Sequence, residues 1–330
     1  MKRPLLNFHL KKLRDFVSRW FRFAGVRSSS DTSQQPIMSA QDMADWGREL
    51  ENYWSSLPPS KRLSELALFG DQSSRFRGQG MEYEESRAYQ PGDELRHLNW
   101  RLMARSGKAF TKLFQEERQA QWVIVLDQRQ SMRFATRGRL KVTQGLRLAG
   151  WLAWMAQQQR VRVQAVGVSE TVSLTPVLQG MSLYQQVMQA LAIPCPIDEQ
   201  ANEAKLSDVI NQLKPHWPTG SRIWLISDFS DLDDSDTPWL NTLNQTFALN
   251  AYLIIDAGEM RLPEKSVLQL SDRQHTYRLQ HAQQTNYRRW AQVYFEQTQR
   301  RLNDNGVSVQ RVFCHDELNQ FIANISPASL

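Results

Sequence analysis

Two short apolar stretches constrain the fold of this chain most, because an aspartate follows directly after each of them. Trp122–Leu126 precedes Asp127, and Arg222–Ser227 precedes Asp228. Both are rich in branched aliphatic residues and contain no Gly or Pro, which is typical of parallel strands covered on both faces. In an open α/β sheet, the carboxyl ends of the strands line the crevice where ligands bind. The pattern therefore predicts two carboxylates at one edge of a buried sheet.

The rest of the second half alternates predicted strands and helices, as expected for an α/β fold with a doubly wound, mostly parallel sheet. We expect further strands in residues 162–168, 251–256 and 307–313, with an antiparallel neighbour at 171–174 and a strand pair within 267–278. Helices are expected in residues 140–158, 182–192, 204–213, 238–247 and 284–304, and from residue 316 onward.

The length of 330 residues fits two domains, or one large domain with extensions. We assign residues 1–37 to a basic tail and linker, residues 38–118 to an N-terminal α+β extension, and residues 119–330 to the sheet domain. In the extension, a helix is expected in residues 41–56 and ends at Pro58 and Pro59. A second helix is expected from Glu94 and a strand in residues 110–116. Met1 and Met38 both fit as the start of the protein.

The positive charge of the chain belongs mostly to its tail. Residues 1–30 contain eight Lys or Arg and one acidic residue, so this segment carries +7, whereas the whole chain carries +6. Apolar residues in the tail follow helical spacing and form a stripe of Leu6, Leu10, Leu13, Val17, Trp20 and Ala24. Most of the basic residues lie off this stripe. Such a segment binds an anionic membrane surface, an acidic partner or the body of its own protein. The sequence leaves these three alternatives open.

The nearly neutral remainder argues against nucleic-acid binding by the body, so this function stays an alternative for the tail alone. No apolar run reaches the length of a membrane span, and Lys or Arg interrupts the N-terminal apolar residues, which argues against a secretory signal. We expect a cytoplasmic protein, with peripheral contact to the inner face of the cytoplasmic membrane as the variant that the tail allows. Cys195 and Cys314 are interpreted as reduced, inert thiols.

The extension carries a spaced set of residues that resembles a bacterial family, domain of unknown function 58. The matching positions are Gly80, Glu84, Arg87, Tyr89, Gly92, Asp93, Arg96, Trp100, Ala104, Arg105 and Glu117. The family pattern continues into a strand that ends in Asp and is followed by Ser, which Asp127 and Ser131 match, so the resemblance spans about residues 75–170. It implies a fold like that of von Willebrand factor A domains, which is Rossmann-like, and a protein-binding role together with a MoxR-type AAA+ ATPase.

The charged residues of the extension allow two interpretations. Arg87, Arg96 and Arg105 stand close in sequence to several acidic residues, so they can form an internal ion-pair network or a docking surface. We favour the internal network, because the fork of an Arg and a carboxylate fixes a loop well. Trp100 is interpreted as a core residue.

The resemblance also implies a metal site, and one position departs from it. Von Willebrand factor A domains hold a metal with Asp-x-Ser-x-Ser after the first strand, a Thr from a later loop and an Asp after a later strand. Asp127, Ser131 and Asp228 match three of these positions, and Ser182 is the best candidate for the Thr. Arg129 stands in place of the middle Ser, and a guanidinium cannot bind a cation.

Three alternatives follow for this degenerate site. Arg129 pairs with one of the two aspartates and replaces the ion. Alternatively, Mg²⁺ binds with water in the missing position. In the third alternative, Asp127 and Asp228 only cap turns or helices.

Charge is divided between the segments that follow the two strands. Five basic residues follow the first strand, namely Arg129, Arg133, Arg137, Arg139 and Lys141. Four further aspartates follow Asp228, namely Asp231, Asp233, Asp234 and Asp236. If the strands are neighbours, a basic lip faces an acidic lip, and we expect this polarised edge to bind a charged partner. Mutual neutralisation on a solvated face is the alternative.

The sequence contains no phosphate-binding Gly-x-x-x-x-Gly-Lys-Ser/Thr loop, no Gly-x-Ser-x-Gly elbow and no His-Glu-x-x-His zinc motif. We therefore expect a non-enzymatic adaptor that acts with a MoxR-type AAA+ ATPase and needs no cofactor. The alternative is a Mg²⁺-dependent hydrolase that uses Asp127, Ser131 and Asp228.

Overall fold

The computed structural model describes ten segments of the chain, and the division of these segments differs from the expected one. They are residues 36–70, 85–90, 100–113, 121–133, 135–136, 138–194, 203–233, 236–261, 267–271 and 276–325. Two compact units are formed, one by Met1–Asp71 with Ala120–Leu330 and the other by Gln72–Gln119. The predicted extension of residues 38–118 is thus split, because its first part belongs to the sheet unit. The tail, residues 1–30, lies outside the described residues.

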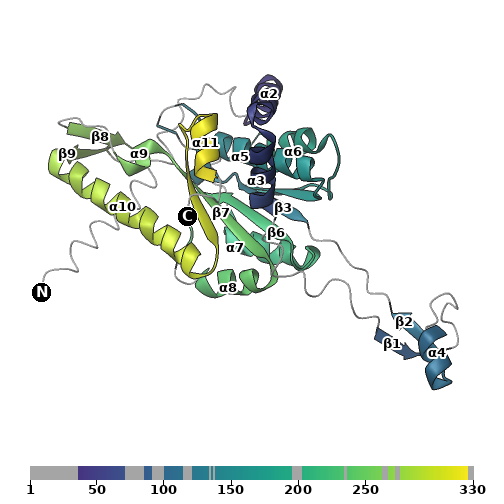
Figure 1. Cartoon of the computed structure of the whole chain (residues 1–330). Coiled ribbons are helices and arrows are strands. Elements are labelled where there is room, and N and C mark those ends of the chain that lie inside the picture. The colour runs from purple at the N-terminus through teal and green to yellow at the C-terminus, as the bar shows by residue number, and fades with distance from the viewer. Residues whose placement is uncertain are drawn as a thin grey trace, which may run out of the picture. The chain divides into compact units, whose positions relative to one another are not determined.

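The first unit is built on a six-stranded sheet (Figure 1). Its strands stand in the order β10 (Ser308–Phe313), β7 (Ala248–Ile255), β6 (Arg222–Ser227), β3 (Trp122–Asp127), β4 (Val163–Val168) and β5 (Val172–Leu174). All neighbours are parallel except β4 and β5. The α/β doubly wound fold that the sequence predicted is confirmed.

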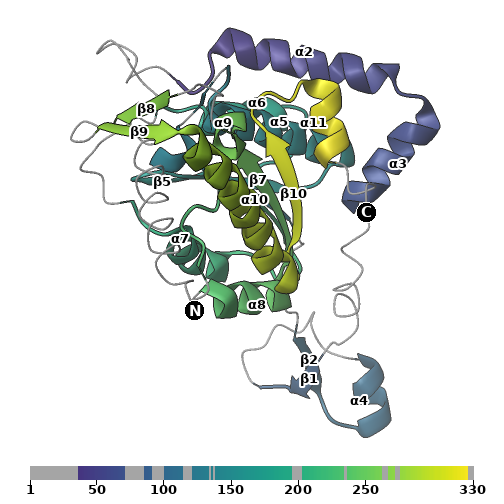
Figure 2. The same cartoon turned by 90° about the vertical axis from the view of Figure 1, so that its left-hand side faces the viewer.

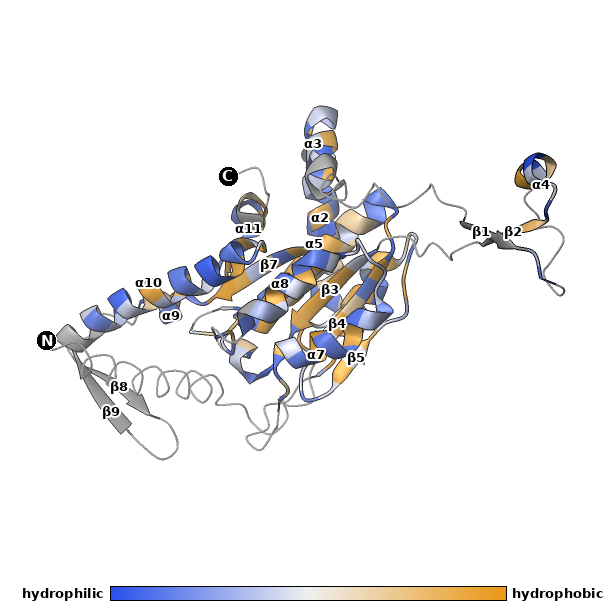
Figure 3. Ribbon diagram, turned by 90° about the horizontal axis from the view of Figure 1, so that it is seen from below, coloured by the Kyte–Doolittle hydropathy of each residue, from blue (hydrophilic) through white to orange (hydrophobic). Residues whose placement is uncertain are grey.

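Helices cover both faces of this sheet, and each strand feeds both layers. Ile124 and Leu126 of β3 belong to one core and Val123 and Val125 to the other, because successive side chains of a strand point to opposite faces. The first core includes residues of α2 (Ala40–Ser56), α5 (Lys141–Gln159), α6 (Leu183–Leu191) and α11 (Leu318–Ile325). The second includes residues of α7 (Leu206–Leu213), α8 (Thr237–Thr246) and α10 (His281–Asp304). Figure 3 shows the apolar strands between these more polar helices.

Helix α2 is fixed on the first core and lies across α5 and α6 (Figure 2). Ser39 caps it by accepting a hydrogen bond from the Asp42 backbone. The Trp46 indole donates to the Arg147 carbonyl at 3.1 Å, and the Arg147 guanidinium lies 3.9 Å from the centre of the Trp46 ring. As predicted, α2 ends before Pro58. The chain then begins α3 (Pro59–Gly70), which the sequence did not predict although Pro is favoured at the first position of a helix.

Short elements complete the first unit. A 3₁₀ turn, η4 (Gln130–Met132), follows β3, another, η5 (Lys214–His216), follows α7, and α9 (Ala257–Met260) follows β7. The strands β8 (Val267–Ser271) and β9 (Thr276–Gln280) form the expected strand pair, which is antiparallel. Cys314 is buried, and burial raises the pKa of its thiol, as an inert cysteine requires; Cys195 lies outside the described residues. No helix in the described ranges is long and apolar enough to cross a membrane.

The second unit contains part of the family pattern. Its strands β1 (Glu85–Ala88) and β2 (Phe110–Leu113) are antiparallel, and α4 (Trp100–Ser106) lies between them in sequence. The Tyr89 backbone donates to the Ala109 carbonyl, and Arg87 pairs in register with Thr111. The side chain of Trp100 is 62% exposed, so the expectation of a core residue is wrong. Gly92, Asp93, Arg96 and the expected start of a helix at Glu94 lie outside the described residues.

Candidate strand-end site

The two aspartates singled out in the sequence meet at the carboxyl edge of the sheet. Strands β3 and β6 are parallel neighbours, with Leu126 opposite Ile226, so Asp127, the last residue of β3, and Asp228, which follows β6, lie at adjacent strand ends. From β3 the chain continues to β4 on one side, whereas β7 follows β6 on the other side. The site therefore lies at the switch point of the sheet, where α/β proteins bind ligands. Ser131 joins it by donating a hydrogen bond to Asp228 at 3.1 Å.

Arg129 is turned into this edge and holds two carboxylates. Its Nε and Nη2 donate to the two oxygens of Asp127 at 2.9 and 2.8 Å. Its Nη1 and Nη2 donate to the two oxygens of Asp231 at 2.5 and 3.0 Å. Burial by itself lowers the pKa of Arg129, but the adjacent Asp127 and Asp231 outweigh that effect and raise the pKa. The guanidinium is therefore a permanent, buried positive charge.

The carboxylate of Asp127 is fully buried and is held by several donors. Besides the guanidinium, it accepts hydrogen bonds from the Arg129 backbone at 3.0 Å and from the Ser227 hydroxyl at 2.6 Å. Ser227, the last residue of β6, thus ties the ends of β3 and β6 together. The third alternative from the sequence, in which these aspartates cap turns, describes part of this arrangement, because Asp127 does bond the backbone two residues on.

A second cation, Lys141, holds the other carboxylate. It is the first residue of α5 and is 1% exposed. Its Nζ donates to Asp228 Oδ2 at 2.7 Å and to Glu259 Oε1 at 2.6 Å. Burial lowers the pKa of Lys141, yet the two carboxylates outweigh this and raise it. Conversely, burial raises the pKa of Asp228, but Lys141 outweighs burial and holds this pKa below its usual value.

Sequence reasoning placed Lys141 only in the basic lip and missed Glu259, although both carried a signal for this site. A Lys at the first position of a helix opposes the helix dipole, which indicates a nearby carboxylate. Asp256 and Glu259 have the spacing of a capping box, and the structure contains it: Asp256 caps α9 and the Asp256 backbone donates to Glu259 at 2.9 Å. This box follows β7, the next strand of the sheet, and fixes the Glu259 side chain beside Lys141. Burial raises the pKa of Glu259 more than Lys141 lowers it.

The residues of this site do not fit a divalent cation. Asp127 and Asp228, the two carboxylates that such an ion needs, each bind a buried side-chain cation at 2.7–2.9 Å. An added Mg²⁺ would have to displace these charges, and two positive groups would repel it. Across the described ranges, no group of three or more His, Cys, Asp or Glu could hold a metal ion.

Ser182, proposed for the position of the Thr, does not join the site. It precedes α6, whose opposite end reaches the strand-end edge, where Gln128 donates to the Leu191 carbonyl at 2.6 Å. The chain before Ser182 pairs with the start of β4, through Leu178 and Val163. Ser182 thus lies toward the opposite end of the strands, where β4 begins.

Of the residues predicted for the basic and acidic lips, Arg129 and Asp231 bind each other, whereas the other described members have different partners. Arg129 and Arg133 are buried, and Arg133 donates to the Gln128 carbonyl, so neither presents its charge at the surface. Arg139 pairs with Glu317 at 2.5 Å. Asp233 is exposed and lies 3.8 Å from Lys205. Arg137 and Asp234 lie outside the described residues.

Fold and site together define an α/β protein whose strand-end carboxylates are held by side-chain cations. The chain belongs to the family described as protein of unknown function DUF58, whose family model matches residues 85–301. This membership confirms the resemblance seen in the sequence.

Curated relatives and a solved structure add partial similarities. The chain is 33% identical over 76 residues to the uncharacterized proteins Mb1516 of Mycobacterium bovis and Rv1480 of Mycobacterium tuberculosis. These matches cover 23% of this chain and 24% of the relatives. A crystal structure of the conserved hypothetical protein BatB from Bacteroides thetaiotaomicron is similar with a TM-score of 0.34 and 14% identity, over 57% of this chain and 99% of that one.

Proposed function

We propose that this chain is a non-enzymatic adaptor that acts in the cytoplasm with a MoxR-type AAA+ ATPase and binds it through the strand-end edge. The observation that carries this proposal is the pairing of Asp127 with Arg129 and of Asp228 with Lys141. These pairs build the edge without a metal and keep it in one arrangement. The class of partner comes from the family resemblance.

The surface around these pairs has the charge pattern of a docking face. Asp233, Lys205 and Glu317 have side-chain exposures of 57%, 50% and 73%. Exposed charges of mixed sign around a rigid centre give specificity and orientation to a protein complex more than raw affinity. The buried pairs below them fix the loops that carry these charges.

The same pairing argues against the hydrolase alternative. Hydrolysis at this edge would need Asp127 or Asp228 to activate water or to hold an ion, and a fixed cation already binds each of them. A base whose pKa is held low by a neighbouring cation abstracts protons poorly near pH 7.

Co-purification with nucleotide tests the proposal. Tagged full-length chain would be recovered from lysates of cells that encode it, with ATP, with ADP or without nucleotide, and bound proteins identified by mass spectrometry. We expect an AAA+ ATPase of the MoxR type. Reversing two exposed edge charges, Asp233→Lys with Glu317→Lys, should reduce its recovery at least about threefold, because rim charges steer association.

Glu296→Lys with Asp304→Lys provides the matched control, since both residues are exposed and the change of charge is the same. They lie in the last part of α10, which leads to the start of β10 at the opposite end of the strands. Recovery from this variant should equal that from the unchanged chain. Failure to recover any AAA+ ATPase in all three nucleotide states would overturn the choice of partner. Equal recovery from the double edge variant would overturn the choice of surface.

A further inference from the structure

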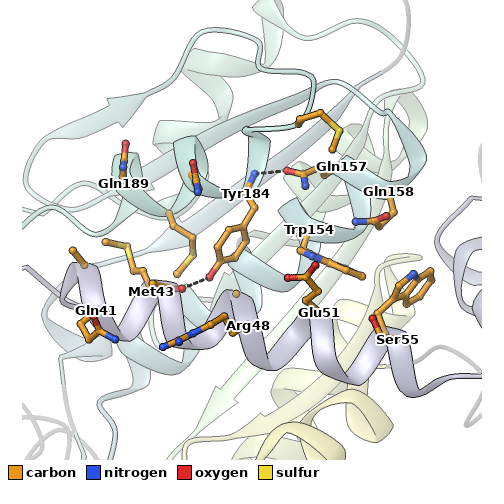
Figure 4. A pocket seen from close by; sticks show the side chains of 17 residues that line it. Gln41, Met43, Arg48, Glu51, Ser55, Trp154, Gln157, Gln158, Tyr184 and Gln189 are labelled. Atoms are coloured by element: carbon orange, nitrogen blue, oxygen red, sulfur yellow. Dashed lines mark hydrogen bonds between the residues drawn. The ribbon is translucent and has the colours of Figure 1, made fainter.

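A pocket of about 900 Å³ lies between α2 and the pair α5 and α6, away from the strand-end site (Figure 4). Trp154, Tyr184 and Met188 are buried residues that line it, while several glutamines make the lining partly polar. Met181 also lines it and is 90% exposed, which is unusual for a large apolar side chain. The pocket therefore presents uncovered apolar surface.

The walls of this pocket are fixed. The Tyr184 hydroxyl donates a hydrogen bond to the Met43 carbonyl at 2.7 Å, as Figure 4 shows. The Tyr184 backbone N–H donates a hydrogen bond to the Gln157 side-chain oxygen at 3.2 Å. Gly47 of α2 and Gly150 of α5 permit the close approach: a Cβ would lie 3.0 Å from Tyr184 at Gly47 and 2.7 Å from Met188 at Gly150. The pocket is thus formed by close helix packing.

The shape of the pocket suits a helix. Residues of α2 from Ala40 to Ser55 line it, which corresponds to a length of roughly 22 Å at 1.5 Å per residue. Methionine side chains adapt to the shape of a bound helix, and grooves of this kind bind amphipathic helices. The apolar stripe of the tail from Leu6 to Trp20 would extend over about 21 Å as a helix.

Helix α2, which forms one wall of the pocket, and the tail carry opposite net charges. The exposed charged residues of α2 are Asp42, Asp45, Glu49, Glu51 and Arg48, and of these Glu51 and Arg48 line the pocket. The tail carries +7 over residues 1–30. Residues 25–35 connect the stripe to the described chain and span at most about 36 Å, which is more than the length of the pocket.

We propose that residues 6–24, which lie outside the described residues, bind in this pocket as an amphipathic helix. The apolar stripe covers the surface that Met181 leaves open, and the basic residues lie near the net negative charge of α2. This docking selects one of the three alternatives that the sequence left open for the tail. It is independent of the adaptor function, because it involves another face of the molecule.

Limited trypsin digestion of the full-length chain tests this docking, because the tail contains eight Lys or Arg. Cleavage within residues 1–27 would be followed by mass spectrometry in the unchanged chain and in a Glu51→Lys, Met181→Lys variant. Both residues are exposed and line the pocket. We expect the variant tail to be cleaved about tenfold faster, since cleavage follows the population of the undocked state. Glu170→Lys, which reverses an exposed charge outside the pocket, should leave the rate unchanged.

Three outcomes would overturn the proposal. Equal cleavage rates in the unchanged chain and in the pocket variant, with both folded by circular dichroism, would exclude docking. Protection that depends on protein concentration, with a dimer in light scattering, would assign the pocket to a second copy. Protection that appears only with vesicles of anionic lipid would assign the tail to the membrane.

Discussion

At the scale of single residues, the strand-end site shows how two permanent cations can replace an ion. Arg129 and Lys141 each lie between two carboxylates, and one carboxylate of each set, Asp127 or Asp228, is buried. A buried ion pair contributes little net stability when it is complete, but the loss of one member leaves a charge without compensation. Each cation is therefore more important for the integrity of the edge than its net contribution suggests.

Lys141→Met should destabilise the protein by about 3–5 kcal/mol at pH 7, because Asp228 and Glu259 would lose their shared cation in a buried site. The free energy of unfolding in urea measures this effect. Arg48→Met removes an exposed cation from α2 and should change stability by less than about 0.5 kcal/mol. A Lys141→Met loss as small as that of the control would show that the pair is not buried in solution.

The same variant should respond to pH with the opposite sign from the unchanged chain. With Lys141 present, the pKa of Asp228 is lowered, so its stabilising effect is complete above the unfolded value of about 3.9 and is lost only as pH falls through the lower folded value. Without Lys141, burial would raise the folded pKa of Asp228, and stability would be lost as pH rises through that value. Lowering the pH from 7 to 5 should therefore narrow the stability gap, measured by urea unfolding at each pH.

Removing both cations should convert the edge into a site that accepts a divalent ion. In Arg129→Ser with Lys141→Met, the Asp-x-Ser-x-Ser pattern is restored and Asp228 is released. We expect 10 mM Mg²⁺ to stabilise this variant, by about 1.4 kcal/mol if its Kd is near 1 mM, and to leave the unchanged chain unaffected. Thermal unfolding with Mg²⁺ and with EDTA measures both. A Mg²⁺-dependent rise in the Tm of the unchanged chain would contradict the replacement of the ion by side chains.

At the scale of elements, periodicity predicted the sheet well and the contacts between elements poorly. Runs such as Arg222–Ser227 identify buried strands by composition, and parallel order then brings Asp127 and Asp228 to one edge. The bond between Lys141 and Glu259 joins positions 118 residues apart, and no local pattern indicates that pairing. The prediction for Ser182 was wrong because Ser182 precedes α6. The nine residues of this helix separate it from Leu191, which does reach the strand-end edge.

The packing of α5 on the sheet depends on a glycine, which leads to a prediction at this scale. A Cβ at Gly145 would lie 2.8 Å from Leu126 Cδ1 and 3.2 Å from Ile226 Cγ2. Gly145→Ala gains about 1 kcal/mol of helix propensity but crowds a closed core at a cost of about 1–3 kcal/mol, so we expect net destabilisation. Adding Leu126→Val makes room for the methyl group, and urea unfolding of the double variant should show less than the sum of the two losses.

At the scale of the whole molecule, the charges are divided between a strongly basic tail and a nearly neutral body. If the tail docks on α2, anionic vesicles compete with the pocket for the same basic residues. The Glu51→Lys, Met181→Lys variant should then bind anionic vesicles more strongly than the unchanged chain, and high salt should remove the difference. Vesicle co-sedimentation at two salt concentrations measures this. Equal binding by both proteins would contradict competition between the membrane and the pocket.

The contact between the first and the last described helices has a consequence for the timing of synthesis. Trp46 of α2 meets Phe321 of α11 with their rings 5.8 Å apart, and β10, formed late in the chain, is the outer neighbour of β7. A nascent chain therefore has to wait for α11 before this core can close. Until then the outer edge of β7 is open to mispairing, so the ribosome-bound intermediate should depend on chaperones more than the finished protein does.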